Sequence, residues 1–345
     1  MSKRGRLVVL ASRSGVEFGK RVVDSMNLMR FDNKKLRKKY NKFELHKMLT
    51  TDFSDDEVES EVPLSVRGAD VYLIQQCHNP YDGRKSSLNS KEGLVGIRAL
   101  RTAGAEKITY VVPLHPGGRS DRTNGRIGIN GRLEADFITI AGANNVLTFD
   151  LHADQMEGFY DVNKTKLDNL KASNVIIPKL EEIIGINNLS NSTSVSVDAG
   201  GAKLAQHYAN ILGSNLALGY KKRSIIETQT VEIVKIMGKL KNIIYSPDDL
   251  IDTGGSVIKL IEKGREINPN ITDIILACTF PLFNKNAVED LRNANVQVIG
   301  TDAIYRGPEF IKANPWYHEV SIAPVVANSI LNLNQNKSLE SCYKD

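Results

Sequence analysis

The sequence has few cysteines and no long hydrophobic run. Its three cysteines, Cys77, Cys278 and Cys342, are widely spaced and include no CxxC pair. Neither a disulfide framework nor a thiolate metal site is indicated, and a reducing cytoplasm is the expected compartment. The first apolar run, Leu7 to Ala11, is too short for a signal-peptide core and is typical of a buried strand. We therefore expect neither an export signal nor a membrane segment.

The chain also lacks a strong net charge, at +5 over 345 residues. With 41% hydrophobic and 25% charged residues it has the composition of a soluble globular protein, and its length suggests about two domains. Charge is uneven only locally, in the basic run KKLRKKYNK at 34–42 and the acidic run DFSDDEVESE at 52–61. The basic run lacks the glycine-aromatic pattern of RNA-binding motifs. A solvated helix face or insertion is favoured over a nucleic-acid site.

Short apolar and β-branched runs alternate with helical patterns along the chain. This alternation predicts α/β layers with mostly parallel sheets. A helix is expected around 324–333, and a polar stretch near 160–166 suits a domain boundary. The segments KITYVVPLHPGGRSDR and KNIIYSPDDLIDTGGS resemble each other weakly, which suggests two related halves. The predicted strands are RLVVLA, ADVYLIQ, KITYVVPL, NVLTFDLH, STSVSVD, NLALGYK, NIIYS, DIILACT and VQVIGTD.

The segment SPDDLIDTGGSV at 246–257 combines acidic residues with a glycine turn before a helical pattern. In a parallel sheet, the strand NIIY would deliver this segment to the edge where ligands bind. Backbone N–H groups of Thr253–Ser256 would form an anion cradle, whereas Asp248 and Asp249 suit hydroxyl donors or a metal ion. A sugar phosphate offers both kinds of group. The competing interpretation is an acidic turn in which Asp252 or Thr253 caps the helix.

Other strand ends carry further polar residues. His152 follows one predicted strand, and Asp198 precedes another Gly-Gly helix start. Lys221 and Arg223 share one side of an extended segment. Arg119, Arg122 and Arg126 lie in a glycine-rich segment suited to closing over polyphosphate. Each residue also has an ordinary structural explanation, but together they favour phosphoryl chemistry on a nucleotide.

In these motifs the chain resembles the phosphoribosyl pyrophosphate synthetases, or ribose-phosphate pyrophosphokinases. The resemblance rests on FSDDEVESEVPLSVRGADVYLIQ, GRSDR, DLHADQMEGFYD, VSVDAGGAK, KKR and DDLIDTGGS, which occur in the family's order along essentially the whole chain. It implies Mg²⁺-dependent transfer of the β,γ-diphosphoryl group of ATP to the anomeric hydroxyl of ribose 5-phosphate, with release of AMP. It also implies two phosphoribosyltransferase-like domains, each a mostly parallel sheet flanked by helices.

The resemblance assigns roles to particular residues. Lys221, Arg223 and Arg119 would be catalytic, by stabilising charge on the transferred group. His152 and Asp198 would position Mg²⁺. The implied ribose-phosphate-binding residues are Asp248, Asp249, Asp252, Thr253, Gly254, Gly255 and Ser256. The implied ATP-binding residues are Phe53, Asp55, Glu57, Arg119, Asp121, Arg122 and His152, with Phe53 stacking on the adenine of a neighbouring subunit.

Residues 1–163 with a C-terminal helix at 322–345 are expected to form an ATP-binding and oligomerisation domain, and 164–321 a ribose-phosphate-binding domain. The expected partners are ATP, ribose 5-phosphate and further copies of the chain, in a hexamer or a dimer-based assembly. Three alternatives stay open. The acceptor could be a larger ribose phosphate such as ADP-ribose, the chain could be a catalytically silent regulatory subunit, or it could be a plain phosphoribosyltransferase.

Overall fold

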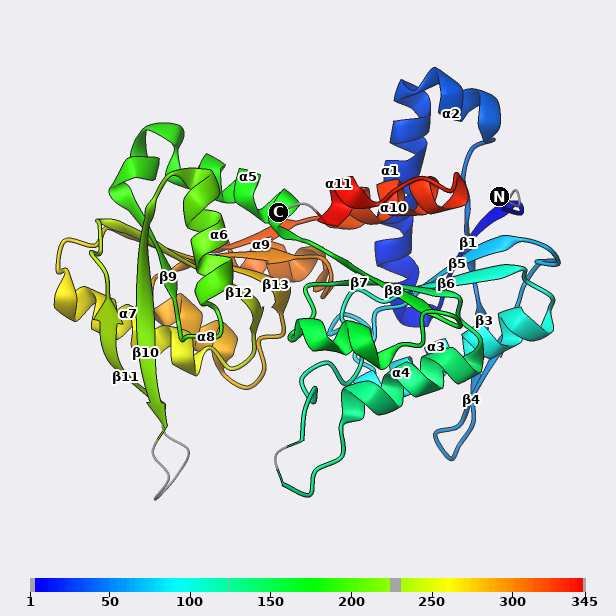
Figure 1. The fold of residues 1–345 in the computed structure, drawn as a ribbon, viewed down its shortest axis with the longest axis horizontal. Helices are drawn as coiled ribbons and strands as arrows, with labels where there is room; N and C mark the ends of the chain where they lie inside the picture. The colour runs from blue at the N-terminus through cyan, green and yellow to red at the C-terminus, as the bar shows by residue number, and fades with distance from the viewer. Residues whose placement is uncertain (1–3, 124, 224–230, 344–345) are drawn as a thin grey trace. The chain divides into compact units, whose positions relative to one another are not determined.

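The computed structural model describes residues 4–123, 125–223 and 231–343. Strands and helices alternate along the chain, and their contacts divide it into two compact units (Figure 1). Unit 1 comprises the described residues up to Lys171, together with 302–306 and those from Ser321 onward. Unit 2 comprises residues 172–301 and 307–320. Both units contain a sheet flanked by helices, so the predicted α/β class is confirmed.

Unit 1 is built on a parallel sheet with the strand order β2-β1-β5-β6-β7-β8. Four of its strands are predicted apolar runs, namely β1 (Leu7–Ala11), β5 (Asp70–Ile74), β6 (Lys107–Val111) and β7 (Asn145–Phe149). The two outer strands, β2 (Leu45–Lys47) and β8 (Lys166–Leu170), were not predicted. One is very short and the other contains charged residues, so neither forms an apolar run.

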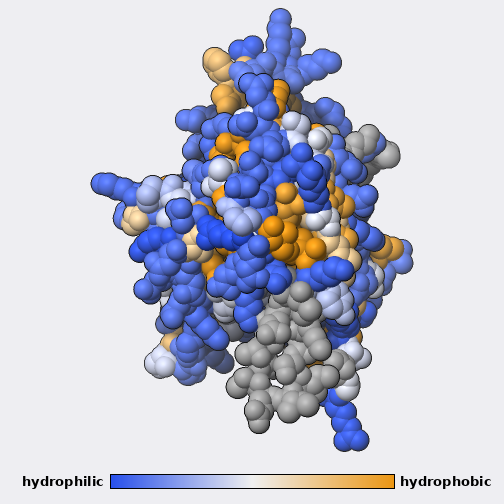
Figure 2. Space-filling model, turned by 90° about the vertical axis from the view of Figure 1, so that its left-hand side faces the viewer, coloured by the Kyte–Doolittle hydropathy of each residue, from blue (hydrophilic) through white to orange (hydrophobic). Residues whose placement is uncertain are grey.

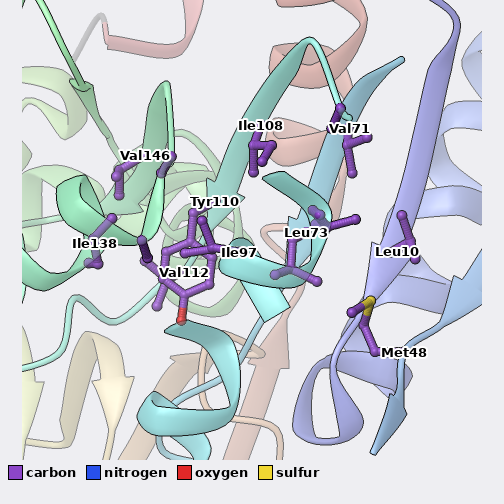
Figure 3. Packing of buried hydrophobic residues seen from close by; sticks show 14 of the residues in the cluster. Leu10, Met48, Val71, Leu73, Ile97, Ile108, Tyr110, Val112, Ile138 and Val146 are labelled. Atoms are coloured by element: carbon purple, nitrogen blue, oxygen red, sulfur yellow. The ribbon is translucent and has the colours of Figure 1, made fainter. Parts of the chain in front are cut away.

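The core of unit 1 fills both faces of this sheet. Alternate strand residues such as Leu10, Leu73 and Tyr110 pack against Ile97 and Ile138 of two helices (Figure 3). These helices are α3 (Ser86–Thr102) and α4 (Asn130–Ala141). The opposite face is covered by α1 (Val16–Asp32) and α10 (Ala323–Asn334), which contact each other. The helix α10 confirms the one expected around 324–333.

Two smaller elements of unit 1 come from the charged part of the sequence. Strands β3 (Leu49–Asp52) and β4 (Val58–Glu61) pair as an antiparallel hairpin whose turn and second strand lie in the acidic run. In the basic run, α2 (Lys34–Lys39) has no buried residue, which supports the interpretation as a solvated helix face. The remaining short elements are η1 (Arg13–Gly15), η2 (Asp154–Phe159) and α11 (Glu340–Tyr343).

Unit 2 contains a sheet with the order β11-β10-β9-β12-β13-β14-β15, parallel except between β10 and β11. Its helices contribute Leu260, Leu291 and other apolar residues to a second core. The strands are β9 (Ser192–Ser196), β10 (Asn215–Arg223), β11 (Val231–Met237), β12 (Ile243–Ile251), β13 (Asp273–Pro281), β14 (Gln297–Thr301) and β15 (Tyr317–Val320). The helical segments are α5 (Ser173–Ile184), η3 (Ile186–Asn191), α6 (Ala202–Leu212), α7 (Gly255–Ile267), α8 (Ala287–Asn293) and α9 (Gly307–Ala313).

The strand β12 is longer than the sequence pattern indicates. We expected it to end at Ser246, before Pro247, but it runs on to Ile251. Proline has no N–H to donate, so it belongs at sheet edges. On one side of β12 the pairing with β9 stops at Tyr245, whereas on the other side β13 pairs as far as Ile251. Pro247 therefore lies where one side of the strand is already an edge.

The surface agrees with the composition. Most of the face drawn in Figure 2 is hydrophilic, with hydrophobic residues confined to patches. Among the described residues, no helix has the length and apolar character needed to cross a membrane.

Candidate active site

In unit 2 the strand order places several polar residues at one edge of the sheet. The chain passes from β9 outward to β10 on one side, and from β12 outward to β13 on the other. The carboxyl ends of β9 and β12 therefore flank a topological switch point, where parallel sheets bind ligands. Asp198 follows β9, and Asp248 and Asp249 lie in the last part of β12. Three predicted acidic residues thus meet at the switch point of unit 2.

These carboxylates influence one another. Burial raises the pKa of Asp248 well above its ordinary value, and the charges of Asp249 and Asp198 raise it further. The backbone N–H of Asp249 donates to Asp248 Oδ1 at 2.9 Å, and that of Leu250 donates to Asp249 Oδ1 at 2.8 Å. A crowded group of carboxylates suits ligands that bring hydroxyl donors or a cation.

The DTGG segment forms a turn into the helix α7. Gly254, at the N-cap, has φ 74°, a left-handed conformation that favours glycine. The turn is fixed from outside, because Asn284 donates its backbone N–H to the carbonyl of Asp252 at 2.9 Å and its side-chain amide to Asp252 Oδ1 at 2.7 Å. The N-cap position of α7 is occupied by Gly254, and not by Asp252 or Thr253 as in the competing interpretation. The N–H groups of its first turn are the type that binds anions.

Asp198 organises the neighbouring loop. Its Oδ1 accepts hydrogen bonds from the backbone N–H groups of Gly200 at 3.0 Å and Gly201 at 3.3 Å, just before α6. Lys221 and Arg223 lie at the end of β10, the strand next to β9. Their side chains lie outside the described part of the structure, so their catalytic role stays a prediction.

In unit 1 the structure brings together two of the predicted segments. The loop that contains Arg119, Asp121 and Arg122 follows β6, and His152 follows β7. The side-chain amide of Gln155 donates to Asp121 Oδ2 at 2.6 Å. The GRSDR and DLHADQMEGFYD segments are therefore in direct contact, with His152 and Arg119 exposed to solvent.

The base of this loop is closed by bonds that the sequence did not indicate. The backbone N–H of Gly131 donates to the carbonyl of Ser120 at 3.0 Å, and Ser120 Oγ accepts from the N–H of Asn130 at 3.1 Å. Nearby, His115 Nε2 lies 2.6 Å from the hydroxyl of Tyr160, and burial lowers the pKa of His115 to about 4. His115 therefore belongs to the framework of the loop, as a neutral buried ring.

The predicted adenine-binding residues lie in the turn of the β3–β4 hairpin. The N–H of Phe53 donates to the carbonyl of Glu57 at 2.9 Å, and the N–H of Glu57 donates to Asp55 Oδ1 at 3.3 Å. Phe53 is 49% exposed. An aromatic ring held at an exposed turn is available for stacking on another flat ring.

An ion-pair network at the switch point of unit 1, between β1 and β5, was missed at the sequence level. Glu92 is buried and accepts from Arg84 Nη1 at 2.7 Å and from the backbone N–H of Arg13 at 2.8 Å. Both arginine side chains also bond to Asp52 at the base of the hairpin. The only sequence signal is that Arg13 lies two residues after the end of β1, which marks it as a residue at a strand end.

The predicted metal ligands lie in different units, His152 in unit 1 and Asp198 in unit 2. Within the described residues, no three His, Cys, Asp or Glu side chains form a metal-binding group. Mg²⁺ commonly takes one or two carboxylates and completes its coordination with water and phosphate oxygens. Asp198, or one of the pair Asp248 and Asp249, offers a carboxylate of this kind.

Comparisons with known proteins bear on the whole chain. A family model described as the N-terminal domain of ribose phosphate pyrophosphokinase matches residues 7–142. The ribose-phosphate pyrophosphokinase of Thermotoga maritima is 32% identical over 85% of this chain and 88% of its own length. That of Aquifex aeolicus is 34% identical over 86% and 90%. The crystal structure of phosphoribosylpyrophosphate synthetase from Mycobacterium smegmatis has a TM-score of 0.80 at 26% identity and covers 96% of this chain and 99% of its own.

Proposed function

The chain belongs to the ribose-phosphate pyrophosphokinase family, and we propose from this premise that it transfers the β,γ-diphosphoryl group of ATP to the anomeric hydroxyl of ribose 5-phosphate. The observation that carries the proposal is the end of β12. There a group of carboxylates and a helix start with glycine at its N-cap adjoin within one loop. This combination suits a ligand that has both hydroxyl groups and a phosphate.

In unit 2, ribose 5-phosphate would bind along this loop. Asp248 and Asp249 would accept hydrogen bonds from the ribose hydroxyls. Residues 252–256 would hold the 5-phosphate, mainly through the backbone N–H groups of Gly254, Gly255 and Ser256. The bonds from Asn284 to Asp252 support this role, because they set the turn in place before a ligand arrives.

In unit 1, ATP would bind to groups that follow β6 and β7, together with the hairpin of a neighbouring subunit. Phe53 would stack on adenine, with Asp55 and Glu57 beside it. Arg119, Arg122 and His152 would contact the phosphates. The contact between Gln155 and Asp121 supports this assignment, because it joins the two segments that carry these side chains.

The reaction moves one diphosphoryl group. The anomeric oxygen forms a bond to the β-phosphorus, the bond from that phosphorus to the α,β-bridging oxygen breaks, and AMP leaves with the electron pair. The hydroxyl proton is lost to solvent or a nearby base. Lys221, Arg223 and Arg119 would stabilise the charge on the transferred group. When bound, Mg²⁺ supplies charge neutralisation on the phosphate oxygens.

The alternatives are less well supported. The curated relatives that span most of the chain are named for ribose phosphate, which does not favour an ADP-ribose acceptor or a silent subunit. The match to an N-terminal pyrophosphokinase domain over residues 7–142 speaks against a plain phosphoribosyltransferase. We further propose that the protein is a cytoplasmic homo-oligomer, hexameric or dimer-based, in which the hairpin serves a neighbouring subunit.

An acceptor assay tests the proposed function. The protein is supplied with ATP, Mg²⁺ and either ribose 5-phosphate or ADP-ribose, and AMP is quantified. We expect AMP to be released with ribose 5-phosphate, in an amount equal to the phosphoribosyl pyrophosphate formed. Release of AMP with ADP-ribose but not with ribose 5-phosphate would show that the larger molecule is the acceptor. AMP with neither would indicate a subunit without catalytic activity.

A further inference from the structure

A pocket lies in unit 1 at the amino-terminal end of β1, the opposite end of the sheet from the predicted ATP-binding segments. It has a volume of about 630 Å³. The pocket forms because β1 and β2 pair only from Val9 and Leu45 onward, and the segments before these residues separate. Its lining residues come from 4–9, 39–44 and 334–336, together with His46. The basic run that the proposed function leaves unused therefore forms one wall.

Three lining residues, Arg4, Tyr40 and Asn334, are held from below by a buried polar network, which forms the floor of the pocket. Buried Asp70 accepts from Arg4 Nη1 at 3.3 Å, from the Tyr72 hydroxyl at 2.8 Å and from the Asn334 amide at 2.8 Å. The Tyr40 hydroxyl donates to Asn334 Oδ1 at 2.7 Å. The charges of Arg4 and Asp70 compensate each other, so the floor is rigid and close to neutral.

The walls carry an excess of positive charge. Arg6, Lys39 and Lys42 line the pocket with Glu44 as the one acidic wall residue. Arg6 donates to the Ser65 carbonyl at 2.8 Å, and within the described residues neither Arg6 nor Lys42 has a carboxylate at ion-pair distance. Lys39 Nζ lies 5.0 Å from the centre of the Tyr40 ring. The walls thus combine cations with an aromatic ring.

We propose that this pocket binds a small organic phosphate that carries several negative charges. The volume is in the range of pockets for small ligands, roughly 300–1,000 Å³. Cations on the walls would neutralise the phosphate groups, and the Tyr40 ring would pack against the organic part. The inference stands independently of the proposed function, because none of these residues has a role in it.

The shape of the site favours a small ligand over nucleic acid. The other basic residues of the run, including Lys35 and Lys38, lie on α2, which has no buried residue and lines the pocket only through its last residue, Lys39. A nucleic-acid backbone would use this convex face, whereas Arg6 and Lys42 line a concave one. Charge at these two places can therefore be removed separately.

A calorimetric titration with inorganic tripolyphosphate in Mg²⁺-free buffer separates the two cases. The pocket variant is Lys39→Glu/Lys42→Glu, and the control is Lys35→Glu/Lys38→Glu, which has the same net charge. We expect the control to bind like the unaltered protein and the pocket variant to bind one equivalent per chain at least about tenfold more weakly. Any binding of tripolyphosphate to the proposed ATP and ribose 5-phosphate sites is the same in both variants, so it does not affect the difference between them.

Two results would overturn the proposal. One is an identical titration of both variants. The other is that the control and the pocket variant lose binding of a short RNA duplex to the same extent while they bind tripolyphosphate equally well. AMP release should be unchanged in both variants, which checks that they fold. If the double variants fail to fold, Lys42→Gln against Lys38→Gln provides the same comparison with smaller changes.

Discussion

In unit 1 the crevice between β1 and β5 is filled by the protein's own ion pairs, whereas in unit 2 the crevice between β9 and β12 is lined by carboxylates. Glu92 has a cationic partner in Arg84. Asp248 instead has its pKa raised by burial and, further, by the charges of Asp249 and Asp198. The same topology therefore supports a satisfied, structural site in one unit and a site of like charges in the other. Like charges held together cost stability and are typical of a ligand site.

The largest expected effect concerns the cations proposed to act on the transferred group. Lys221→Ala should lower kcat for AMP release by about 10²-fold to 10³-fold, because charge on the transferred diphosphate would lose a preorganised partner. Lys222→Ala is the matched control, since neighbouring positions of a strand alternate between its faces. Equal losses in both variants would contradict the assignment. The thermal unfolding midpoint should stay the same, because a strand-end lysine that faces a ligand supports little of the core.

Removal of a charge from the ion-pair network of unit 1 should lower the stability of that unit. Glu92→Gln keeps the shape of the side chain but leaves the Arg84 guanidinium without its buried partner, which should cost about 3 kcal/mol. Amide hydrogen exchange in α3 would measure the loss within unit 1. Glu59→Gln, on the exposed hairpin, should change the exchange little. If Glu92→Gln and Glu59→Gln change the exchange equally, the ion pairs of Glu92 do not stabilise unit 1, and the contrast with the carboxylates of unit 2 fails.

The buried ring of His115, in the framework of the unit 1 loop, should make the stability of the protein depend on pH. The pKa of His115 falls from 6.5 to about 4 in the folded protein because the ring is buried. A depressed folded pKa means that stability is fully present above pH 6.5 and is lost as the pH falls towards 4, by up to about 3 kcal/mol. Denaturant titrations at pH 7, 6, 5 and 4.5 would measure this. His115→Gln should remove that part of the slope, and an unchanged slope would rule His115 out as its source.

Much of the fold follows from local sequence signals. All nine predicted apolar runs form strands, because buried parallel strands need continuous apolar residues. The missed strands include β3, β4 and β8, which are short or polar, and their pairing depends on neighbours far away in the sequence. The end of β12 was misplaced for a similar reason. Taken alone, Pro247 predicts the end of a strand. It fits within β12 because the pairing with β9 already stops at Tyr245, so the missing N–H costs no hydrogen bond on that side.

The candidate site was predicted unevenly. The acidic pair Asp248–Asp249 and the DTGG turn could be identified because their residue types have a direct chemical meaning at a strand end. The network of Glu92 and Arg84 could not, since a glutamate inside a helical pattern looks like any solvated residue. Only the sheet topology shows that Glu92 lies under the switch point of unit 1. Sequence patterns thus indicate candidate ligand-binding groups more readily than groups that serve the framework.

The smallest expected effect has the opposite sign to that in unit 1. Asp248→Asn should stabilise unit 2 in buffer that contains a chelator. The folded pKa of Asp248 is raised, so its ionisation costs stability as the pH rises through that pKa. Asparagine cannot ionise, and a gain of about 1 kcal/mol at neutral pH is expected. Trp316, the only tryptophan, lies in unit 2, and its fluorescence during denaturation would report the change.

The same variant should bind its substrate less well. An amide cannot replace a carboxylate as a strong acceptor for two hydroxyls, so the KM for ribose 5-phosphate should rise by about tenfold while the KM for ATP changes little. Glu262→Gln, on the exposed face of α7, is the control for both measurements. A loss of stability in Asp248→Asn, like that expected for Glu92→Gln, would show that the carboxylates of unit 2 are as well compensated as those of unit 1. The contrast between the two switch points would then have to be abandoned, whatever the variant does to KM.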